Sequence, residues 1–188
     1  VSQAFVPAVA FGLDFLKLEF PASISKENLI LEIQKVQRKH QNLCGLIIQL
    51  PLPLKLQSFT REITNNINLN IDIDCLSHQA LGQILMGENA LIPPTPGAII
   101  EILNYYKVDL AGKEVCLVGR GNLIGKPLAG MIMNSKATLV SCDKFTPDLS
   151  LYTKKADIII TGVGKKDLIT GAIIKKGAII VDAGVCFE

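Results

Sequence analysis

The chain has 188 residues, of which 49% are hydrophobic and 5% aromatic, and its formal net charge is +2. This length suffices for one large domain or two small ones with a buried core. The small net charge, with lysines in isolated pairs, argues against a nucleic-acid-binding surface. Charged residues interrupt every apolar segment before about eighteen residues, so the sequence implies no membrane span.

The cysteines and histidines point to a reducing compartment without a metal site. None of the five cysteines has C-x-x-C spacing, and most lie inside apolar runs such as "VCLVG". This pattern favours reduced core thiols in a cytoplasmic protein over disulfides. His40 and His78 have no second ligand three or four residues away, so we expect no metal. The apolar start lacks a basic n-region and a methionine, which indicates a fragment or processed chain rather than a signal peptide.

The first half of the chain alternates between strand and helix patterns. Ser25 is a plausible N-cap, and Leu29, Ile33 and Val36 recur at helical spacing after it. The expected elements are a strand at 14–20, a helix at 25–40, a strand at 43–50, a short helix at 57–67, and loop or extended chain at 69–77.

The second half begins at "IPPTPG" (92–97), which has three prolines and marks a domain boundary. The expected elements after it are a helix at 97–106 with Pro96 in its first turn, a strand at 113–119, a helix at 125–135, a strand at 137–142, a helical turn or two at 148–155, and strands at 157–164 and 177–185. Apolar strands that alternate with helices predict a parallel sheet covered on both faces. The fold class is therefore α/β, with an incomplete N-terminal α/β domain (1–95) and a Rossmann-like dinucleotide-binding domain (96–188).

The stretch "VCLVGRGNLIGKP" (115–127) carries the clearest chemical signal. A buried strand runs into Gly119, Gly121 and Gly125 and then into a helix. Such a turn must be tight, and its backbone must approach a pyrophosphate at the helix N-terminus. The G-x-G-x-x-x-G spacing is a variant of the usual fingerprint, and it predicts nucleotide binding.

The second strand of the Rossmann-like unit ends at "SCDK" (141–144), where such units read the adenosine ribose. Asp143 would accept a hydrogen bond from a 2′-hydroxyl, which favours NAD. Lys144 and Arg120 would pair with a 2′-phosphate, which favours NADP. Asp143 as an ordinary turn residue is the third interpretation, so these residues leave the cofactor open.

Glycines also follow the later strands, in "TGVGKKDLI" and "VDAGVCF". Ligands of open α/β sheets bind along the carboxyl edge. Gly162, Gly164 and Gly184 would therefore let a cofactor approach the backbone, although ordinary turns explain each of them equally well.

Polar residues in the first half offer candidate substrate contacts. Gln49 is a polar residue in the apolar run "GLIIQLPLPL", and a buried amide must bond either to its neighbours or to a ligand. Asp72 and Asp74 share a side if "NIDIDC" is extended, and one could then accept an N–H from a substrate ring. The alternative is that both are solvated loop carboxylates.

Together, "GLIIQLPLP", "DID", "PPTPGAIIEIL", "LVGRGNLIGKP", "ADIIITGVGK" and "GAIIVDAGV" occur in an order and spacing that resemble the methylenetetrahydrofolate dehydrogenase/methenyltetrahydrofolate cyclohydrolase family. The resemblance implies a typically dimeric enzyme of one-carbon metabolism, with folate in a cleft between an N-terminal α/β domain and a Rossmann domain. Members of this family oxidise 5,10-methylenetetrahydrofolate, usually with NADP, and hydrolyse the methenyl product to 10-formyltetrahydrofolate.

The resemblance also implies roles for single residues. Gln49 would assist the catalytic lysine, and Asp74 would hold the pterin ring. The substrate-binding set would be Phe5, Leu50, Pro51, Thr95 and Pro96. The cofactor-binding set would be Gly119, Arg120, Gly121, Lys144, Gly164 and Val185, with no metal ligand.

Several positions depart from the family pattern. The family's G-R-S turn reads "GRG", so Gly121 lacks the serine hydroxyl, and C-H-S reads "CDK" at 142–144. The family's D-V-D-G reads "DIDC", which places Cys75 at a glycine position, and P-C-T-P reads "PPTP". The CDK change either keeps a cation for NADP or marks a shift toward NAD.

The start of the chain departs most from the family pattern. "SQAFV" resembles the start of the family's S-x-x-Y-V-x-x-K, with Phe5 at the tyrosine and Val9 at the lysine position. Because valine cannot move a proton, we expect no cyclohydrolase activity. We also expect a chain shortened at both ends. The competing hypotheses are a folate- or nucleotide-binding pseudoenzyme that partners a complete subunit, and a Rossmann oxidoreductase for another small substrate.

Overall fold

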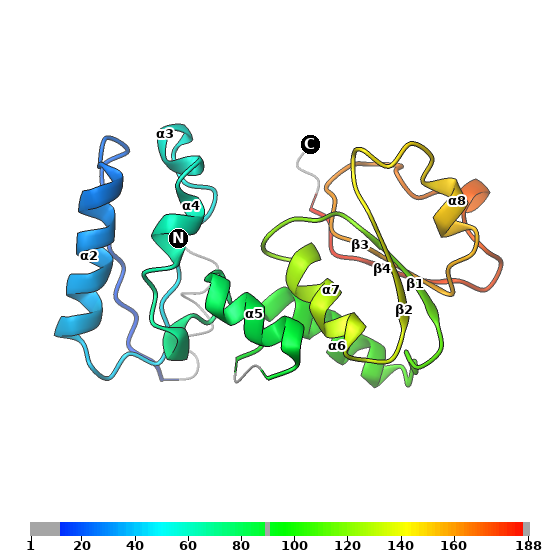
Figure 1. The fold of residues 1–188 in the computed structure, drawn as a ribbon, viewed down its shortest axis with the longest axis horizontal. Coiled ribbons are helices and arrows are strands. Elements are labelled where there is room, and N and C mark those ends of the chain that lie inside the picture. The colour runs from blue at the N-terminus through cyan, green and yellow to red at the C-terminus, as the bar shows by residue number, and fades with distance from the viewer. Residues whose placement is uncertain (1–11, 89–90, 186–188) are drawn as a thin grey trace.

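The computed structural model describes residues 12–88 and 91–185, and it places two regions side by side (Figure 1). The first region contains α2 (Lys26–Lys39), α3 (Leu54–Gln57), α4 (Thr60–Thr64), η1 (Leu69–Ile71) and α5 (His78–Met86). Its core is built from buried side chains of α2, α3, α4 and the segment before α3: Leu29, Ile33, Leu52, Leu56 and Ile63. The sequence prediction for α2 is confirmed, and the Ser25 side chain accepts a hydrogen bond from the Asn28 N–H at 3.2 Å.

The prediction of two strands in this region is wrong. Within the described part of the chain, neither 14–20 nor 43–50 forms a β-strand. A strand needs a ladder of backbone hydrogen bonds to a neighbour, and the alternating pattern in the sequence does not supply that neighbour. The Leu46 N–H instead bonds to the Ile71 carbonyl at 2.7 Å, which ties the second segment to η1.

The sequence analysis missed α5, which joins the two regions. Its N-cap is Ser77, whose side chain accepts from the Ala80 N–H at 3.2 Å, and it ends at Gly87 in the left-handed conformation. This helix packs against α7 (Gly125–Met133) of the second region. The contact is close, because a Cβ on Gly130 would lie 3.2 Å from the Leu85 Cα. The amide of Asn134 reinforces it by donating to the Ile84 carbonyl at 3.0 Å.

The second region is a parallel sheet of four strands in the order β2-β1-β3-β4. The strands are β1 (Glu114–Val118), β2 (Thr138–Cys142), β3 (Ile158–Thr161) and β4 (Ile179–Asp182). All three pairings are parallel, with Val115 opposite both Leu139 and Ile158. The four strands predicted from the sequence in this region are confirmed, and so is the parallel sheet.

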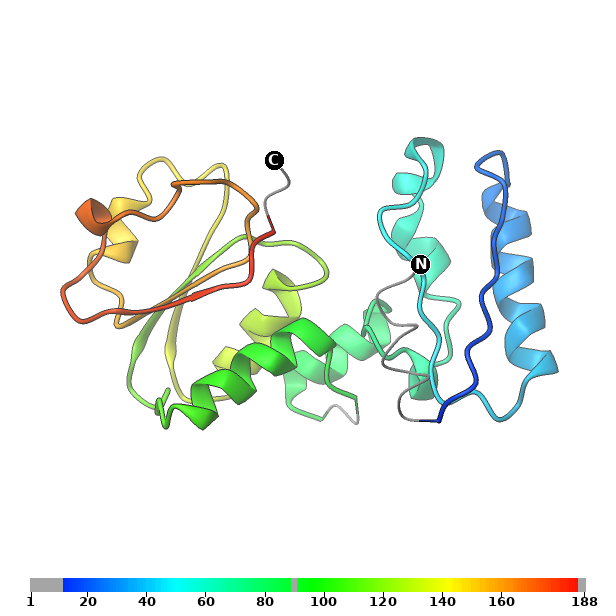
Figure 2. The ribbon, with the colours of Figure 1, turned by 180° about the vertical axis from the view of Figure 1, so that it is seen from behind.

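Helices cover this sheet on both sides (Figure 2). On one face α6 (Pro94–Tyr105) and α7 pack against alternate strand residues to form the largest core: Ile99, Leu103, Leu110, Val115, Leu117, Leu128, Ile132, Ile158 and Ile160. The other face carries Cys116, Val118, Cys142 and Ile159, covered by residues around α8 (Ser150–Thr153) and by the segment that contains η2 (Gly171–Ile173). Alternation of the strand side chains between these two cores explains why the central strands β1 and β3 are apolar along most of their length.

The helix α6 starts at Pro94, so Pro96 lies in its first turn as expected. The helix also packs in the second region, and the domain boundary at residue 95 stays a prediction. No helix in the described ranges is long and apolar enough to cross a membrane.

Lys107 ends α6 in a conformation that suits glycine. Its φ is +56°, and the next residue, Val108, donates its N–H to the Leu103 carbonyl at 2.9 Å, as in a Schellman motif. Because Lys107 is exposed, Lys107→Gly is expected to raise the free energy of unfolding by about 0.5–1 kcal/mol. Urea unfolding measures this gain. Lys107→Ala is the control, and an equal gain from alanine would contradict the explanation, because alanine keeps the left-handed strain.

Candidate functional site

The glycine-rich turn after β1 has the shape expected for phosphate binding. Gly119 has φ +110°, and a Cβ there would lie 2.9 Å from the Val163 Cγ2. A Cβ on Gly125 would lie 2.1 Å from the Gly119 carbonyl oxygen, so α7 can begin here only with glycine. A Cβ on Gly121 would meet no atom within 4 Å. Gly119 and Gly125 therefore build the turn, whereas Gly121 leaves its outer surface open to a ligand.

The turn lies where the strand order reverses. The chain goes from β1 to β2 on one side and then crosses to β3 on the other side of β1. The connections that leave β1 and β3 therefore diverge, and this divergence is the usual ligand crevice of an open α/β sheet. The first and third β-strands thus place the glycine turn beside the segment that follows Thr161.

The later glycines have mixed roles. A Cβ on Gly162 would lie 3.3 Å from Ile124 Cγ2, and one on Gly184 would lie 2.5 Å from the Val163 carbonyl oxygen. Gly184 is thus required for packing between the ends of β3 and β4, whereas at Gly162 a small shift of the Ile124 side chain would be needed to admit a Cβ. Gly164 and Val185 are exposed in the same part of the structure, and Val185 is 66% accessible. Their cofactor roles stay predictions.

A cavity of about 360 Å³ lies at the carboxyl ends of β1 and β2. Arg120 lines it and forms an ion pair with Asp143, with Nη1 3.3 Å from Oδ2. The Arg120 guanidinium also donates to the Ser141 carbonyl. Phe145 lines the cavity as well, and the Lys144 ammonium lies 5.0 Å from the centre of its ring. The structure thus brings together the residues that the sequence analysis assigned to the ribose end of the nucleotide.

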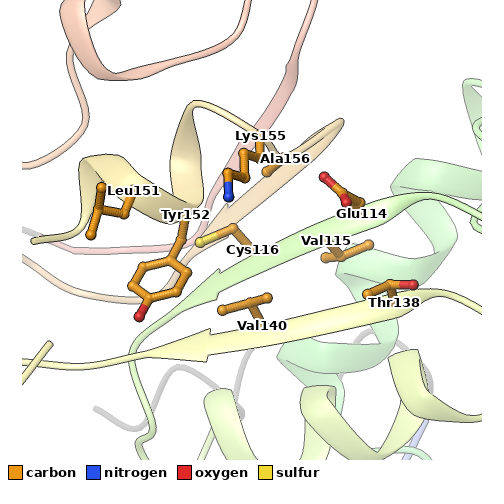
Figure 3. A pocket seen from close by; sticks show the side chains of 9 residues that line it. All are labelled: Glu114, Val115, Cys116, Thr138, Val140, Leu151, Tyr152, Lys155 and Ala156. Atoms are coloured by element: carbon orange, nitrogen blue, oxygen red, sulfur yellow. The ribbon is translucent and has the colours of Figure 1, made fainter.

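A second cavity, of about 400 Å³, lies over the amino-terminal halves of β1 and β2, and it shares Val140 and Tyr152 with the first (Figure 3). Glu114 and Thr138, the first residues of β1 and β2, line it together with Tyr152 and Lys155. Because ligands of parallel sheets bind at the carboxyl ends, this cavity is not the nucleotide site. Cys116 lies in its wall, and burial raises the pKa of that thiol to about 12, so the thiol stays protonated.

Gln49 does not match the prediction of a buried amide. Its side chain is exposed, and Nε2 donates to the carbonyl of the next residue, Leu50, at 3.1 Å. The expectation failed because 43–50 is not a buried strand. The Leu50–Pro51 peptide bond is cis, Leu50 is half-buried and Pro51 is exposed. The amide and Pro51 are therefore accessible to a ligand, and their roles in substrate binding stay predictions.

Asp72 and Asp74 have different environments. Asp72 is completely buried, and its carboxylate accepts from the Leu76 N–H at 3.0 Å and the Ser77 N–H at 2.8 Å. Asp72 therefore fixes the segment that leads into α5 and is not available to a ligand. Asp74 is half-buried, and burial, with a smaller contribution from the charge of Asp72, raises the pKa of its carboxyl. Only Asp74 thus remains available for substrate.

Cys75 occupies a position that suits glycine, since its φ is +52°. The side chain is 3% exposed, and its thiol approaches the Leu91 carbonyl at 3.7 Å. This contact places Asp74 in the same part of the structure as the start of α6. Thr95 is exposed and Pro96 is buried in that first turn, so Thr95 is the accessible member of the pair.

The sequence analysis missed Lys126, which follows the glycine turn directly in "GKP". Its ammonium donates to Asn122 Oδ1 at 2.6 Å. Burial and, to a smaller degree, the positive charge of Arg61 lower the pKa of Lys126. A cation of α7 is therefore electrostatically coupled to one of α4, in the other region.

Phe5 and Val9 lie outside the described residues. In the described ranges, no group of three or more His, Cys, Asp or Glu residues could hold a metal ion.

The fold and this site define a Rossmann-type NAD(P)-binding α/β protein. The family described as "Tetrahydrofolate dehydrogenase/cyclohydrolase, NAD(P)-binding domain" matches residues 93–188. The chain therefore belongs to this family. The bifunctional protein FolD of Clostridium perfringens is 37% identical over 173 residues, which cover 92% of this chain and 61% of that relative.

Solved structures are similar over almost the whole chain. The methylenetetrahydrofolate dehydrogenase-cyclohydrolase (FolD) of Trypanosoma brucei, solved with NADP and an inhibitor, has a TM-score of 0.87 at 30% identity and covers 97% of this chain and 64% of that one. The 5,10-methylenetetrahydrofolate dehydrogenase of the silkworm Bombyx mori has a TM-score of 0.88 at 28% identity, with 100% and 69% covered. These similarities confirm the resemblance noted in the sequence.

Proposed function

We propose that the chain catalyses the NAD(P)-dependent oxidation of 5,10-methylenetetrahydrofolate to 5,10-methenyltetrahydrofolate, with NADP as the cofactor and NAD as the alternative. The observation that supports this most directly is the open glycine turn at the switch point of the sheet, next to the cavity lined by Arg120. The similar proteins of Trypanosoma brucei and Bombyx mori are methylenetetrahydrofolate dehydrogenases, and the former was solved with NADP.

The residues present fit a dinucleotide. Gly121 leaves space for phosphates beside the backbone, and the cavity at the end of β2 offers both a guanidinium and a carboxylate. A bound nicotinamide supplies the acceptor for a hydride. The protein's own contribution to this step is to hold the cofactor and the folate in a fixed relative position, and positioning of this kind accounts for much of such catalysis.

We propose that the folate binds in a cleft toward the N-terminal region, against Leu50, Pro51 and Thr95, with Phe5 as a further contact and with the buried Pro96 holding the turn that presents Thr95. Asp74 would accept an N–H from the pterin ring. Its raised pKa fits a carboxyl in a partly desolvated position, where a hydrogen bond is stronger than in water. The exposed amide of Gln49 would then be free to turn toward the bound folate.

We further propose that this chain does not hydrolyse the methenyl product, because Val9 occupies the lysine position of the family pattern. We propose that the protein is a cytoplasmic homodimer. Its reaction would serve one-carbon metabolism and, through it, purine biosynthesis. The alternative is a pseudoenzyme that binds folate or nucleotide and partners a complete subunit, which the substitution at position 9 favours.

The test follows nucleotide reduction and methenyl hydrolysis separately with the purified chain. We expect reduction of NADP or NAD with methylenetetrahydrofolate, and no methenyl hydrolysis above the spontaneous rate. Asp74→Asn is expected to raise KM for the folate about tenfold, since a charged acceptor is replaced by a neutral one. The matched control is Asp109→Asn, an exposed residue of the second region whose Oδ1 accepts from the Ala111 N–H.

Three results would change the proposal. Tight nucleotide binding without any turnover would favour the pseudoenzyme. A robust rate of methenyl hydrolysis would contradict the assignment of Val9. An equal effect of the two aspartate substitutions would remove Asp74 from the folate site.

A further inference from the structure

The ion pair between Arg120 and Asp143 lies in the wall of the cavity at the end of β2, where the sequence analysis expects the adenosine ribose. Arg120 uses Nη1 for Asp143 Oδ2 and Nη2 for the Ser141 carbonyl. Both outer nitrogens of the guanidinium therefore already have partners within the protein. A phosphate would have to use the remaining N–H donors of this guanidinium or displace one of these partners, and Asp143 already offsets part of its positive charge.

The carboxylate of Asp143 is held in place from several directions. Its Oδ1 accepts from the Phe145 N–H at 2.9 Å, and the backbone N–H of Asp143 donates to Thr146 Oγ1 at 3.0 Å. The side chain keeps 23% of its surface exposed, against 52% for Arg120. Asp143 is thus fixed by its turn, whereas the longer arginine is the partner that can move.

These contacts have opposite consequences for the two cofactors. A ribose 2′-hydroxyl can donate to the Asp143 carboxylate without disturbing the turn. A 2′-phosphate brings about two negative charges to the same place, and the carboxylate repels them. Lys144 adds a second cation, but it lies over the Phe145 ring. The three charged side chains sum to +1, where Arg120 and Lys144 alone would give +2.

We propose that Asp143 is a cofactor-selectivity residue, which lowers the affinity for NADP relative to NAD by engaging Arg120 and by placing a carboxylate beside the 2′ position. This proposal rests on the proposed function, since it assumes that the glycine turn binds a dinucleotide. Asp143 does not abolish the use of NADP. It reduces a preference that Arg120 and Lys144 would otherwise set.

The experiment measures the dissociation constants of NADP⁺ and NAD⁺ by calorimetry for the parent chain and for Asp143→Asn. Asparagine keeps the oxygen that accepts from the Phe145 N–H, removes the charge, and replaces the oxygen that faces Arg120 by an NH₂ group, so the ion pair is lost as well. We expect the Kd of NADP⁺ to fall about tenfold, because the charge that repels the 2′-phosphate is removed. The Kd of NAD⁺ should rise about threefold, because a charged acceptor for the 2′-hydroxyl becomes neutral.

Asp148→Asn is the matched control. Asp148 lies in the same connection, is exposed, and accepts from the Ser150 N–H at 2.9 Å through Oδ1, in the same type of turn. Removing its charge should leave the ratio of the two Kd values unchanged within twofold. Circular dichroism of all variants checks that they remain folded.

A double-mutant cycle with Arg120→Gln tests the ion pair itself. In the parent chain this change should weaken NADP⁺ binding about threefold, because Arg120 is partly neutralised. In the Asp143→Asn background it should weaken binding about thirtyfold, so the coupling is about tenfold. Additive effects would overturn the proposal.

The outcomes separate this inference from the proposed function. If neither nucleotide binds to the parent chain, both are overturned. If both bind and Asp143→Asn leaves the ratio of their Kd values unchanged, the selectivity role is overturned while the dinucleotide site stands. A shift of the ratio toward NADP⁺ by more than fivefold, absent from Asp148→Asn, supports the role of Asp143.

Discussion

Alanine at position 125 is expected to lower the free energy of unfolding by about 3 kcal/mol and to abolish nucleotide binding. The added Cβ would lie 2.1 Å from the Gly119 carbonyl oxygen and 2.9 Å from the Arg120 Cα. All of these neighbours are backbone atoms, so no side chain can turn away. The start of α7 must then move off the end of β1, and both core packing and the phosphate turn are lost. Urea unfolding and NADP⁺ calorimetry measure the two effects.

Gly121→Ala is the control for this prediction. No atom lies within 4 Å of its Cβ position, so the free energy of unfolding should change by less than about 0.5 kcal/mol. The methyl group would still occupy the open surface of the turn, and nucleotide affinity should therefore fall. If Gly125→Ala were as stable as Gly121→Ala, the structural role assigned to Gly125 would be wrong.

The sequence predicted the second region better than the first, for a physical reason. Strands β1 and β3 are buried on both faces, so they are continuous apolar runs, and glycines mark their ends. In the first region, "DFLKLEF" has the same local pattern as a strand, but Leu16 and Leu18 are about half exposed. Whether such a segment becomes a strand depends on a neighbour in space, which local periodicity does not reveal.

The helix α5 was missed although its signals are local. Ser77 and Gly87 are a normal N-cap and C-cap, and nine residues lie between them. In the candidate site, by contrast, the missing information was not local. The sequence identified Arg120 and Asp143 separately, as residues that favour different cofactors. Their ion pair follows from the register that sets Val118 beside Cys142, and this pairing of distant segments is not visible in the sequence.

Removal of the Asp72 carboxylate is expected to be as damaging as a large cavity in the core. Asp72→Ala deletes two hydrogen bonds from a buried, charged acceptor and leaves the N–H groups of Leu76 and Ser77 without it. Each such bond contributes about 1.5–3 kcal/mol, so the free energy of unfolding should fall by about 3–6 kcal/mol. Urea unfolding gives the size of the loss, and hydrogen exchange at 76–86 should show that it begins in α5.

Two further variants distinguish this explanation from a general effect of lost charge. Asp72→Asn keeps one acceptor oxygen but sets an NH₂ group against the second N–H, so it should cost about half as much as alanine. Asp109→Ala removes an exposed carboxylate that accepts one N–H, and it should cost less than about 1 kcal/mol. Helix α5 packs on α7, which starts at the glycine turn. When Asp72 no longer fixes the N-terminal end of α5, α7 should therefore be held less firmly as well. Nucleotide affinity should therefore fall with Asp72→Ala and not with Asp109→Ala, although neither residue contacts the proposed cofactor.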